Sequence, residues 1–261
     1  MTGTFAATLA VLGFGSAFIA GLVGVGGAIV MIPLLYYVPP WLGVGALDVK
    51  HVSGITMGQV LAVTAIGTAV HGGAGALHRP LALVSGTSMA AGSLAGAVGS
   101  RYIGGRVLLT VFGVMGLMAL VLMFLPSPVE SWGAVGNEVH FDRKAAVLYP
   151  AAIGILSGLV GAGGSFLLMP VLVGVMRIPF RVSIGTSLAI VGVSAVTGFF
   201  GKLVTGQVPL WPTVSVIAGG VPGVVAGAWL SRRVPTEALR VCLGVLIALA
   251  TIRVWVDVLF D

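Results

Sequence analysis

Residues 21–33 read GLVGVGGAIVMIP and residues 158–170 read GLVGAGGSFLLMP, so one glycine-rich motif occurs twice, 137 residues apart. Four glycines and a closing proline disfavour a continuous helix, because glycine is entropically costly there and proline lacks a hydrogen-bond donor. Both copies nevertheless lie in long apolar runs. In a bilayer, irregular backbone survives only where protein buries it or where it lines a wet cavity. The motif therefore predicts two broken membrane helices at corresponding places, a pattern that points to a central binding site.

The composition indicates an integral membrane protein. The chain has 261 residues, of which 58% are hydrophobic and 8% charged, and its mean hydropathy is +1.15. A soluble domain carries about 25% charged residues. The net charge of +6 comes from basic residues scattered singly between apolar segments, which is typical of signals for membrane topology. We therefore expect contact with the lipid bilayer and no nucleic-acid partner.

The apolar runs predict ten helical segments in an all-α polytopic protein, with five segments on each side of a polar connector. The connector is expected at residues 126–145, between a first transmembrane repeat at 1–125 and a second at 146–261. A span needs about 20 residues, so each motif is expected to divide a long run into a full helix and a short one. The expected helices are 5–21, 28–38, 52–70, 81–100 and 107–125, then 147–161, 165–176, 184–201, 211–230 and 239–256.

The duplication extends beyond the glycine motif. The matching pairs occur in one order, namely Ser53 with Ser183, Thr56 with Thr186, Gly92-x-x-x-Gly96 with Gly223-x-x-x-Gly227, and Ser100-Arg101 with Ser231-Arg232. The Gly-x-x-x-Gly pairs are expected to pack helices closely. If the short helix crosses the membrane, each half has five crossings and the two repeats are inverted. If it does not, each half has four crossings and the repeats are parallel. The basic residues divide eight to five in both cases, so the positive-inside rule does not decide; we expect inverted repeats with the broken helices at the centre.

The duplicated motifs resemble those of the sulfite exporter TauE/SafE family of bacterial membrane proteins. The second half carries Gly161-Ala162-Gly163-Gly164 with Pro170, then Ile184-Gly185-Thr186-Ser187-Leu188. The first half carries Gly24-Val25-Gly26-Gly27 with Pro33, then Gly54-Ile55-Thr56-Met57, so Met57 stands where Ser187 stands. The resemblance implies a multi-pass protein of the bacterial inner membrane that exports small sulfur-containing anions, such as sulfite or organosulfonates.

The residues themselves also point to an anion. If a helix begins after each glycine motif, its first N–H groups lack partners and carry a partial positive charge. Two such ends facing each other would cradle a small oxyanion. The expected substrate-binding residues are Gly26, Gly27, Thr56, Gln59, Gly163, Gly164, Ser165, Thr186 and Ser187. The alternatives are that the glycines serve packing alone and that the hydroxyls bond their own helix.

Three basic residues, His51, His71 and Lys202, are candidates for gating or coupling, although helix-end or interfacial anchoring would also explain them. None of the seven acidic residues lies clearly within a span, which argues against a metal or sodium site, and no cofactor is expected. Catalytic motifs and an ATPase domain are also absent from the sequence, so we expect a transporter working by alternating access and not an enzyme. An anion channel and a non-transporting scaffold subunit remain alternatives, and a homo-oligomer is compatible with either.

Overall fold

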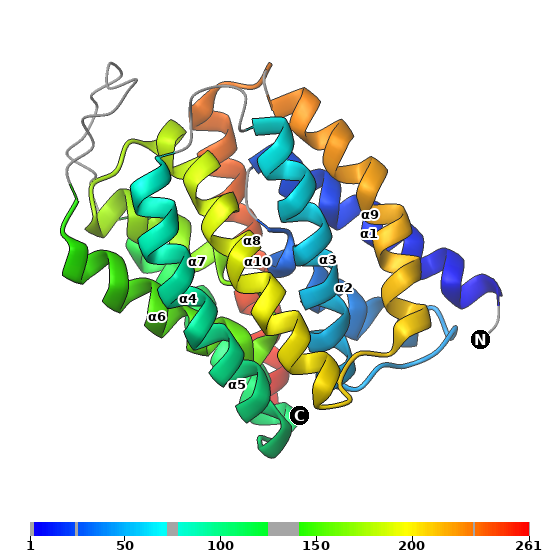
Figure 1. Cartoon of the computed structure of the whole chain (residues 1–261). Coiled ribbons are helices and arrows are strands. Elements are labelled where there is room, and N and C mark those ends of the chain that lie inside the picture. Colours follow the sequence, from blue (N-terminus) through cyan, green and yellow to red (C-terminus); the bar gives the residue numbers. More distant parts are fainter. Residues whose placement is uncertain (1–2, 24–25, 72–77, 125–140, 232, 261) are drawn as a thin grey trace.

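The computed structural model describes residues 3–23, 26–71, 78–124, 141–231 and 233–260, and the regular structure in these ranges is entirely helical (Figure 1). The helices of the first half begin and end within three residues of the predicted bounds. They are α1 (Gly3–Val23), α2 (Ala28–Trp41), α3 (Val49–His71), α4 (Arg79–Gly99), the 3-10 turn η2 (Ser100–Tyr102) and α5 (Gly105–Phe124).

The second half follows the same order, and three of its helices extend four residues beyond an expected bound. Its elements are α6 (Arg143–Val160), α7 (Ser165–Pro170), the π-helical segment η3 (Val171–Val175), α8 (Phe180–Val204), α9 (Leu210–Ser231) and α10 (Thr236–Phe260). Helix α6 begins at Arg143, four residues before the expected helix start at 147 and inside the expected connector 126–145, while the bounds of the connector and of the two repeats stay predictions. Asp142 explains the earlier start, since its carboxylate accepts a hydrogen bond of 2.8 Å from the Lys144 N–H, as a good N-cap does. Residues 126–140 of the connector lie outside the described ranges.

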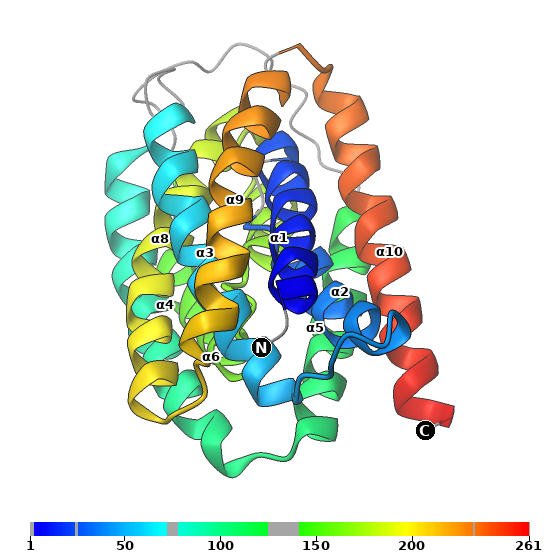
Figure 2. The ribbon, with the colours of Figure 1, turned by 90° about the vertical axis from the view of Figure 1, so that its right-hand side faces the viewer.

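The fold is that of a polytopic α-helical membrane protein, as the composition predicts. Eight helices of the described chain are long and apolar enough to cross a membrane: α1, α3, α4, α5, α6, α8, α9 and α10. We call the end of the bundle where α2 ends and α3 begins the lower face, and the end where α3 ends the upper face (Figures 1 and 2). Trp41, Tyr102 and Trp211 are largely exposed at helix ends near the lower face, where aromatic residues favour the membrane interface.

Small residues bring the helices into backbone contact. A Cβ added to Gly92 or Gly96 of α4 would meet the carbonyl oxygen of Ala151 or Ile155 of α6, and α9 contacts α1 in the same way. Both pairs are parallel, because contacts advance along the two helices in the same direction. The packing role predicted for the Gly-x-x-x-Gly motifs is therefore confirmed.

The two halves of the chain interlock. Helix α1 pairs with α9 of the other half, α6 pairs with α4, and α3 lies against α8 between these pairs. Since α4 and α9 run in opposite directions (Figure 1), their parallel partners α6 and α1 also run in opposite directions. These directions are compatible with inverted repeats, while the repeat itself and its bounds remain predictions from the sequence.

Candidate functional site

Helices α2 and α7 begin inside the bundle, at the glycine motifs. Gly27 is the N-cap of α2, and a Cβ added to it would lie 3.0 Å from the Cβ of Ala20 in α1. Gly164 is the N-cap of α7, and its Cβ would lie 2.8 Å from Ile153 Cγ2 in α6. Because Ala20 and Ile153 precede the ends of α1 and α6, the chain turns back into the bundle at each motif. The predicted helix starts near Gly27 and Gly164 are thus confirmed.

Glycine is required at both turns for its backbone conformation. The φ angles of Gly27 and Gly164 are +75° and +71°, in the left-handed region that costs other residues about 1–2 kcal/mol. Neither N-cap has a side chain that could accept a hydrogen bond from the first turn. The N-terminus of each short helix is therefore left to be satisfied by other groups.

The two glycine motifs meet through one hydrogen bond. The N–H of Gly26 donates to Ser165 Oγ over 2.7 Å. Gly26, Gly27, Gly163, Gly164 and Ser165 are all buried, so the structure brings together five of the predicted site residues in a closed region. The motifs are not equivalent there, because Ala28 occupies the position in α2 that Ser165 occupies in α7.

Two valines that the sequence did not single out close the region from the sides. A Cβ added to Gly163 would lie 2.5 Å from Val60 Cγ1 of α3 and 3.2 Å from Val191 Cγ1 of α8. Val60 also lies 3.3 Å from the Cβ position of Gly26. The motifs are therefore clamped between α3 and α8, the two central helices of the bundle.

The predicted hydroxyl residues outside the motifs bond elsewhere in this conformation. Thr56 Oγ1 donates to Val52 O over 2.8 Å, and Ser187 Oγ donates to Ile184 O over 3.0 Å, which is local bonding within each helix. Thr186 Oγ1 accepts a hydrogen bond of 3.1 Å from the His78 N–H. Substrate contacts of these three residues remain predictions.

Gln59 lies on the α1 side of the first motif. Its Nε2 donates to Ser16 Oγ over 2.6 Å and to Gly13 O over 3.3 Å. Its Oε1 is buried and has no hydrogen-bond partner among the described residues. Ser16, whose carbonyl oxygen lies 3.2 Å from the Cβ position of Gly27, therefore links Gln59 to the motif, and no sequence motif marked it.

The basic candidates occupy different environments. Lys202 is fully buried near the end of α8, and its Nζ donates to Ser100 Oγ, Leu159 O and Gln207 Oε1 over 2.7, 2.9 and 3.1 Å. His51 is exposed at the start of α3. His71 is the last residue of α3, and its side chain lies outside the described part of the structure. No sequence pattern indicated Gln207, and Ser100 stands out in the sequence only as a match within the repeat.

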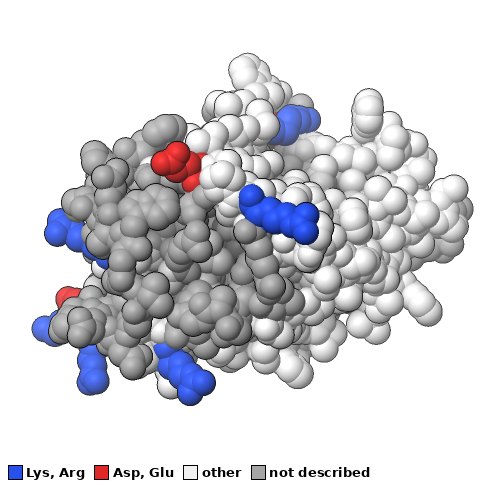
Figure 3. All heavy atoms as spheres, turned by 90° about the horizontal axis from the view of Figure 1, so that it is seen from above, with Lys and Arg blue, Asp and Glu red and all other residues white. Residues whose placement is uncertain are grey.

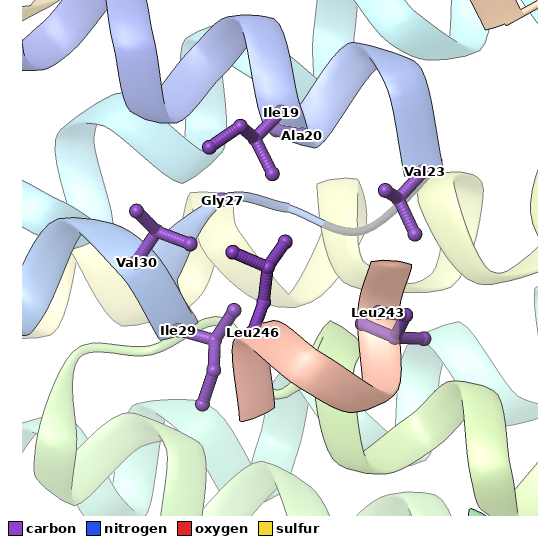
Figure 4. Close-up of a pocket in the computed structure, with 8 residues that line it drawn as sticks. All are labelled: Ile19, Ala20, Val23, Gly27, Ile29, Val30, Leu243 and Leu246. Carbon is purple, nitrogen blue, oxygen red and sulfur yellow. The ribbon is translucent and has the colours of Figure 1, made fainter. Parts of the chain in front are cut away.

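A small hollow next to Gly27 has the wrong chemistry for an anion. It lies between α1, α2 and α10 (Figure 4), and its volume of about 210 Å³ includes space open to the outside. All eight lining residues are apolar or glycine: Ile19, Ala20, Val23, Gly27, Ile29, Val30, Leu243 and Leu246. An oxyanion would lose its hydration without gaining hydrogen bonds there.

Comparison with known sequences supplies the family. Residues 9–254 match the sequence profile described as sulfite exporter TauE/SafE. The chain belongs to the TauE/SafE family. As a member of this family of membrane transporters, it is a multi-pass protein of the bacterial inner membrane, in contact with lipid and a small substrate.

Two relatives of this TauE/SafE protein match it over most of both chains. It is 25% identical to the probable membrane transporter protein YdhB of Bacillus subtilis (strain 168) over 227 residues, which cover 85% of this chain and 89% of YdhB. It is 29% identical to a probable membrane transporter protein of Xylella fastidiosa (strain Temecula1 / ATCC 700964) over 252 residues, which cover 91% and 90% of the two chains. No solved structure gives a significant match.

Proposed function

We propose that this TauE/SafE protein is a secondary transporter that exports small sulfur oxyanions or organosulfonates, with the substrate bound between the two glycine motifs. The observation that carries the proposal is the hydrogen bond between the Gly26 N–H and Ser165 Oγ. It places two helix beginnings from opposite halves of the chain next to each other in the interior of the bundle. The family description supports the class of substrate.

The chemistry of this region suits an anion. The first backbone N–H groups of α2 lie at the positive end of that helix, beside this region. The continuous helical run of α7 and η3 likewise has its positive end at Gly164, next to the same region. On binding, the Gly26 N–H would turn from Ser165 Oγ to a substrate oxygen, and the Ser165 hydroxyl would donate a second hydrogen bond. Hydrogen bonds to a charged acceptor are about twice as strong as neutral ones, so the exchange favours an oxyanion over water.

In the proposed site, Thr56 and Thr186 would stand on the two routes out of this region. Helix α3 rises from the lower face and reaches Thr56 four residues before Val60, and α8 descends from the upper face and reaches Thr186 five residues before Val191. In the proposed cycle, rocking of α1, α9 and α3 against α6, α4 and α8 would open one route while the other stays packed. Thr56 and Thr186 would then each meet the substrate on one side.

The distribution of charge sets the proposed direction. Arg79, Arg143, Lys144, Arg177 and Arg233 are exposed on elements that begin or end at the upper face, and Figure 3 shows Lys and Arg side chains projecting there. By the positive-inside rule this face, with the connector, is cytoplasmic. Export would therefore carry the anion from the upper face to the lower face, with both ends of the chain outside the cytoplasm.

The test is counterflow in proteoliposomes. Vesicles holding the purified chain are loaded with unlabelled sulfite or sulfoacetate, and the uptake of the radiolabelled anion is followed with and without a pH gradient. A carrier gives saturable uptake that internal unlabelled anion accelerates. Flux that neither saturates nor responds to internal anion would indicate a channel. The absence of flux from folded protein would favour a scaffold subunit, and chemical change of the anion would indicate an enzyme.

A further inference from the structure

Lys202 is a buried cation whose three partners are all neutral. Its Nζ faces Ser100 Oγ, Leu159 O and Gln207 Oε1. The Ser100 hydroxyl also donates to Ala97 O over 2.7 Å, which leaves its lone pairs facing the lysine. Three acceptors match the three N–H groups of an ammonium ion. A buried charge without a counter-ion is costly in a membrane protein and marks a functional position by default.

Helix ends stabilise this cation in place of a carboxylate. Leu159 lies in the last turn of α6, Ser100 directly follows α4, and Lys202 is in the last turn of α8. The C-terminal ends of three helices, each with a partial negative charge, therefore lie near one lysine side chain, and α6 supplies a backbone carbonyl to it directly. The same contacts tie α4, α6 and α8 together at the lower face.

A row of α3 residues leads from the lower face, beside Lys202 and its partners, to the glycine motifs. One face of α3 carries Lys50 near the lower face, Ser53 one turn further, and Val60 at the motifs. Beside this face, a Cβ added to Gly161 would meet Ser53 O and Oγ, and one added to Gly54 would meet Gln207 O. The end of α6 and the turn after α8 thus close the route along α3, and Lys202 binds both of them.

We propose that Lys202 is an ammonium latch of the lower gate, which exchanges its three protein acceptors for the oxyanion when the gate opens. The inference rests on the proposed function and adds a second anion contact, outside the glycine motifs. Lys50 lies next to the latch, with its Nζ bonded to Arg101 O over 2.8 Å, so a departing anion passes from one cation to another. An attractive charge at the exit selects anions and raises their local concentration.

The test uses one introduced cysteine to report the opening of the route at the lower face and another to report the opening of the route at the upper face. Ser53 is 2% exposed, and its Oγ has no hydrogen-bond partner among the described residues, so Ser53→Cys loses no bond. Ser183, which matches Ser53 in the second half, provides Ser183→Cys as the reporter at the upper end of α8. Both are made with Cys242→Ser, and the rate of maleimide labelling is measured in the purified full chain. Sulfoacetate serves as the anion, because sulfite itself reacts with maleimides.

Lys202→Met removes the charge and keeps the length of the side chain. We expect Lys202→Met to raise the labelling rate at position 53 at least tenfold and to leave the rate at position 183 unchanged. In the parent with native Lys202, sulfoacetate should accelerate labelling at position 53. Lys202→Met should abolish this acceleration. Lys144→Met is the matched control, because Lys144 is exposed at the start of α6 on the upper face, and it should change neither rate more than twofold. An unchanged rate at position 53 would overturn the latch. An acceleration by sulfoacetate that persists in Lys202→Met would overturn the anion exchange.

Two further outcomes separate this inference from the proposed function. A parent that sulfoacetate does not accelerate, with a faster Lys202→Met, would support the latch and overturn the anion exchange, while counterflow of sulfite still decides the proposed function. If Lys202→Met yields no folded protein, Ser100→Ala removes one acceptor only and should raise labelling at position 53 by a smaller factor. No rise in that variant would overturn the latch.

Discussion

The N–H of Gly26 donates a 2.7 Å hydrogen bond to Ser165 Oγ, although 139 residues separate them in the chain. This bond is where the ends of two broken helices touch. It is also one-sided, because Ala28 has no hydroxyl to offer the second motif in return. One side chain, that of Ser165, therefore carries the polar link between the two halves at the proposed substrate site.

Ser165→Ala is expected to weaken both folding and transport. The buried Gly26 N–H would lose its acceptor, which costs about 1–3 kcal/mol, and the substrate would lose a donor. We expect a lower melting temperature in detergent and at least a tenfold loss of counterflow activity. Ser215→Ala is the control, because Ser215 Oγ bonds only its own helix at Trp211 O and its loss should leave transport intact. Full activity in Ser165→Ala would remove this residue from the site.

Gly164→Ala is expected to destabilise the fold by about 2 kcal/mol or more, from the left-handed φ and from contacts at 2.8 Å with Ile153 Cγ2 and Met89 Cε. Gly15→Ala is the comparison, because its Cβ would meet nothing within 4 Å in α1 and alanine favours a helix by about 0.5–1 kcal/mol. Equilibrium unfolding in detergent or mixed micelles measures both. Equal stability of the two variants would contradict the assigned backbone conformation. A larger residue such as valine at Gly27 or Gly164 would disturb folding, so a loss of transport in such a variant would not by itself identify the substrate site.

Gly92→Ala and Gly86→Ala test the helix pairing on one helix. In α4, a Cβ at Gly92 would press on Ala151 O and lie 3.0 Å from Ile155 N of α6, whereas one at Gly86 would lie 3.7 Å from Val193 Cβ. Overpacking costs about 1–3 kcal/mol, so Gly92→Ala should unfold more easily while Gly86→Ala stays neutral or gains stability. A reversed order in the same unfolding measurement would show that α4 and α6 are further apart than described.

The sequence predicted the helices well, because long apolar runs, prolines and glycines are local signals. The start of α6 was missed because one capping residue, Asp142, extends the helix into a polar segment. The glycine motifs were found from their duplication, but their contact through Ser165 depends on how the two halves of the chain pack against each other. Val60, Ser16 and Gln207 were missed for the same reason, since an ordinary valine, serine or glutamine acquires its role only from tertiary packing. The hydroxyl of Thr56 bonds its own helix in this conformation, as one of the two interpretations of the sequence has it, and its contact with a substrate stays a prediction.

Gln59→Met tests whether the buried amide serves folding or the substrate. The change removes the bonds to Ser16 Oγ and Gly13 O but also the buried Oε1 that has no partner among the described residues. These two effects oppose each other, so we expect stability to change by less than about 1 kcal/mol while the KM for transport rises. Thr64→Val is the control on the same helix, because Thr64 Oγ1 bonds only carbonyl groups of α3. A loss of stability with an unchanged KM would make Gln59 a packing residue.

The central claim is that an oxyanion binds between the two glycine motifs, and ligand-dependent melting of the purified protein tests it most directly. A ligand that binds only the folded state stabilises it by about 2.7 kcal/mol at one hundred times its dissociation constant. We expect sulfite to raise the melting temperature of the wild type in a saturable way, relative to chloride at equal ionic strength. We expect a much smaller rise in Ser165→Ala and an unchanged rise in Ser215→Ala. A wild type whose melting temperature ignores sulfite and sulfoacetate, or a Ser165→Ala variant that responds as the wild type does, would contradict the central claim.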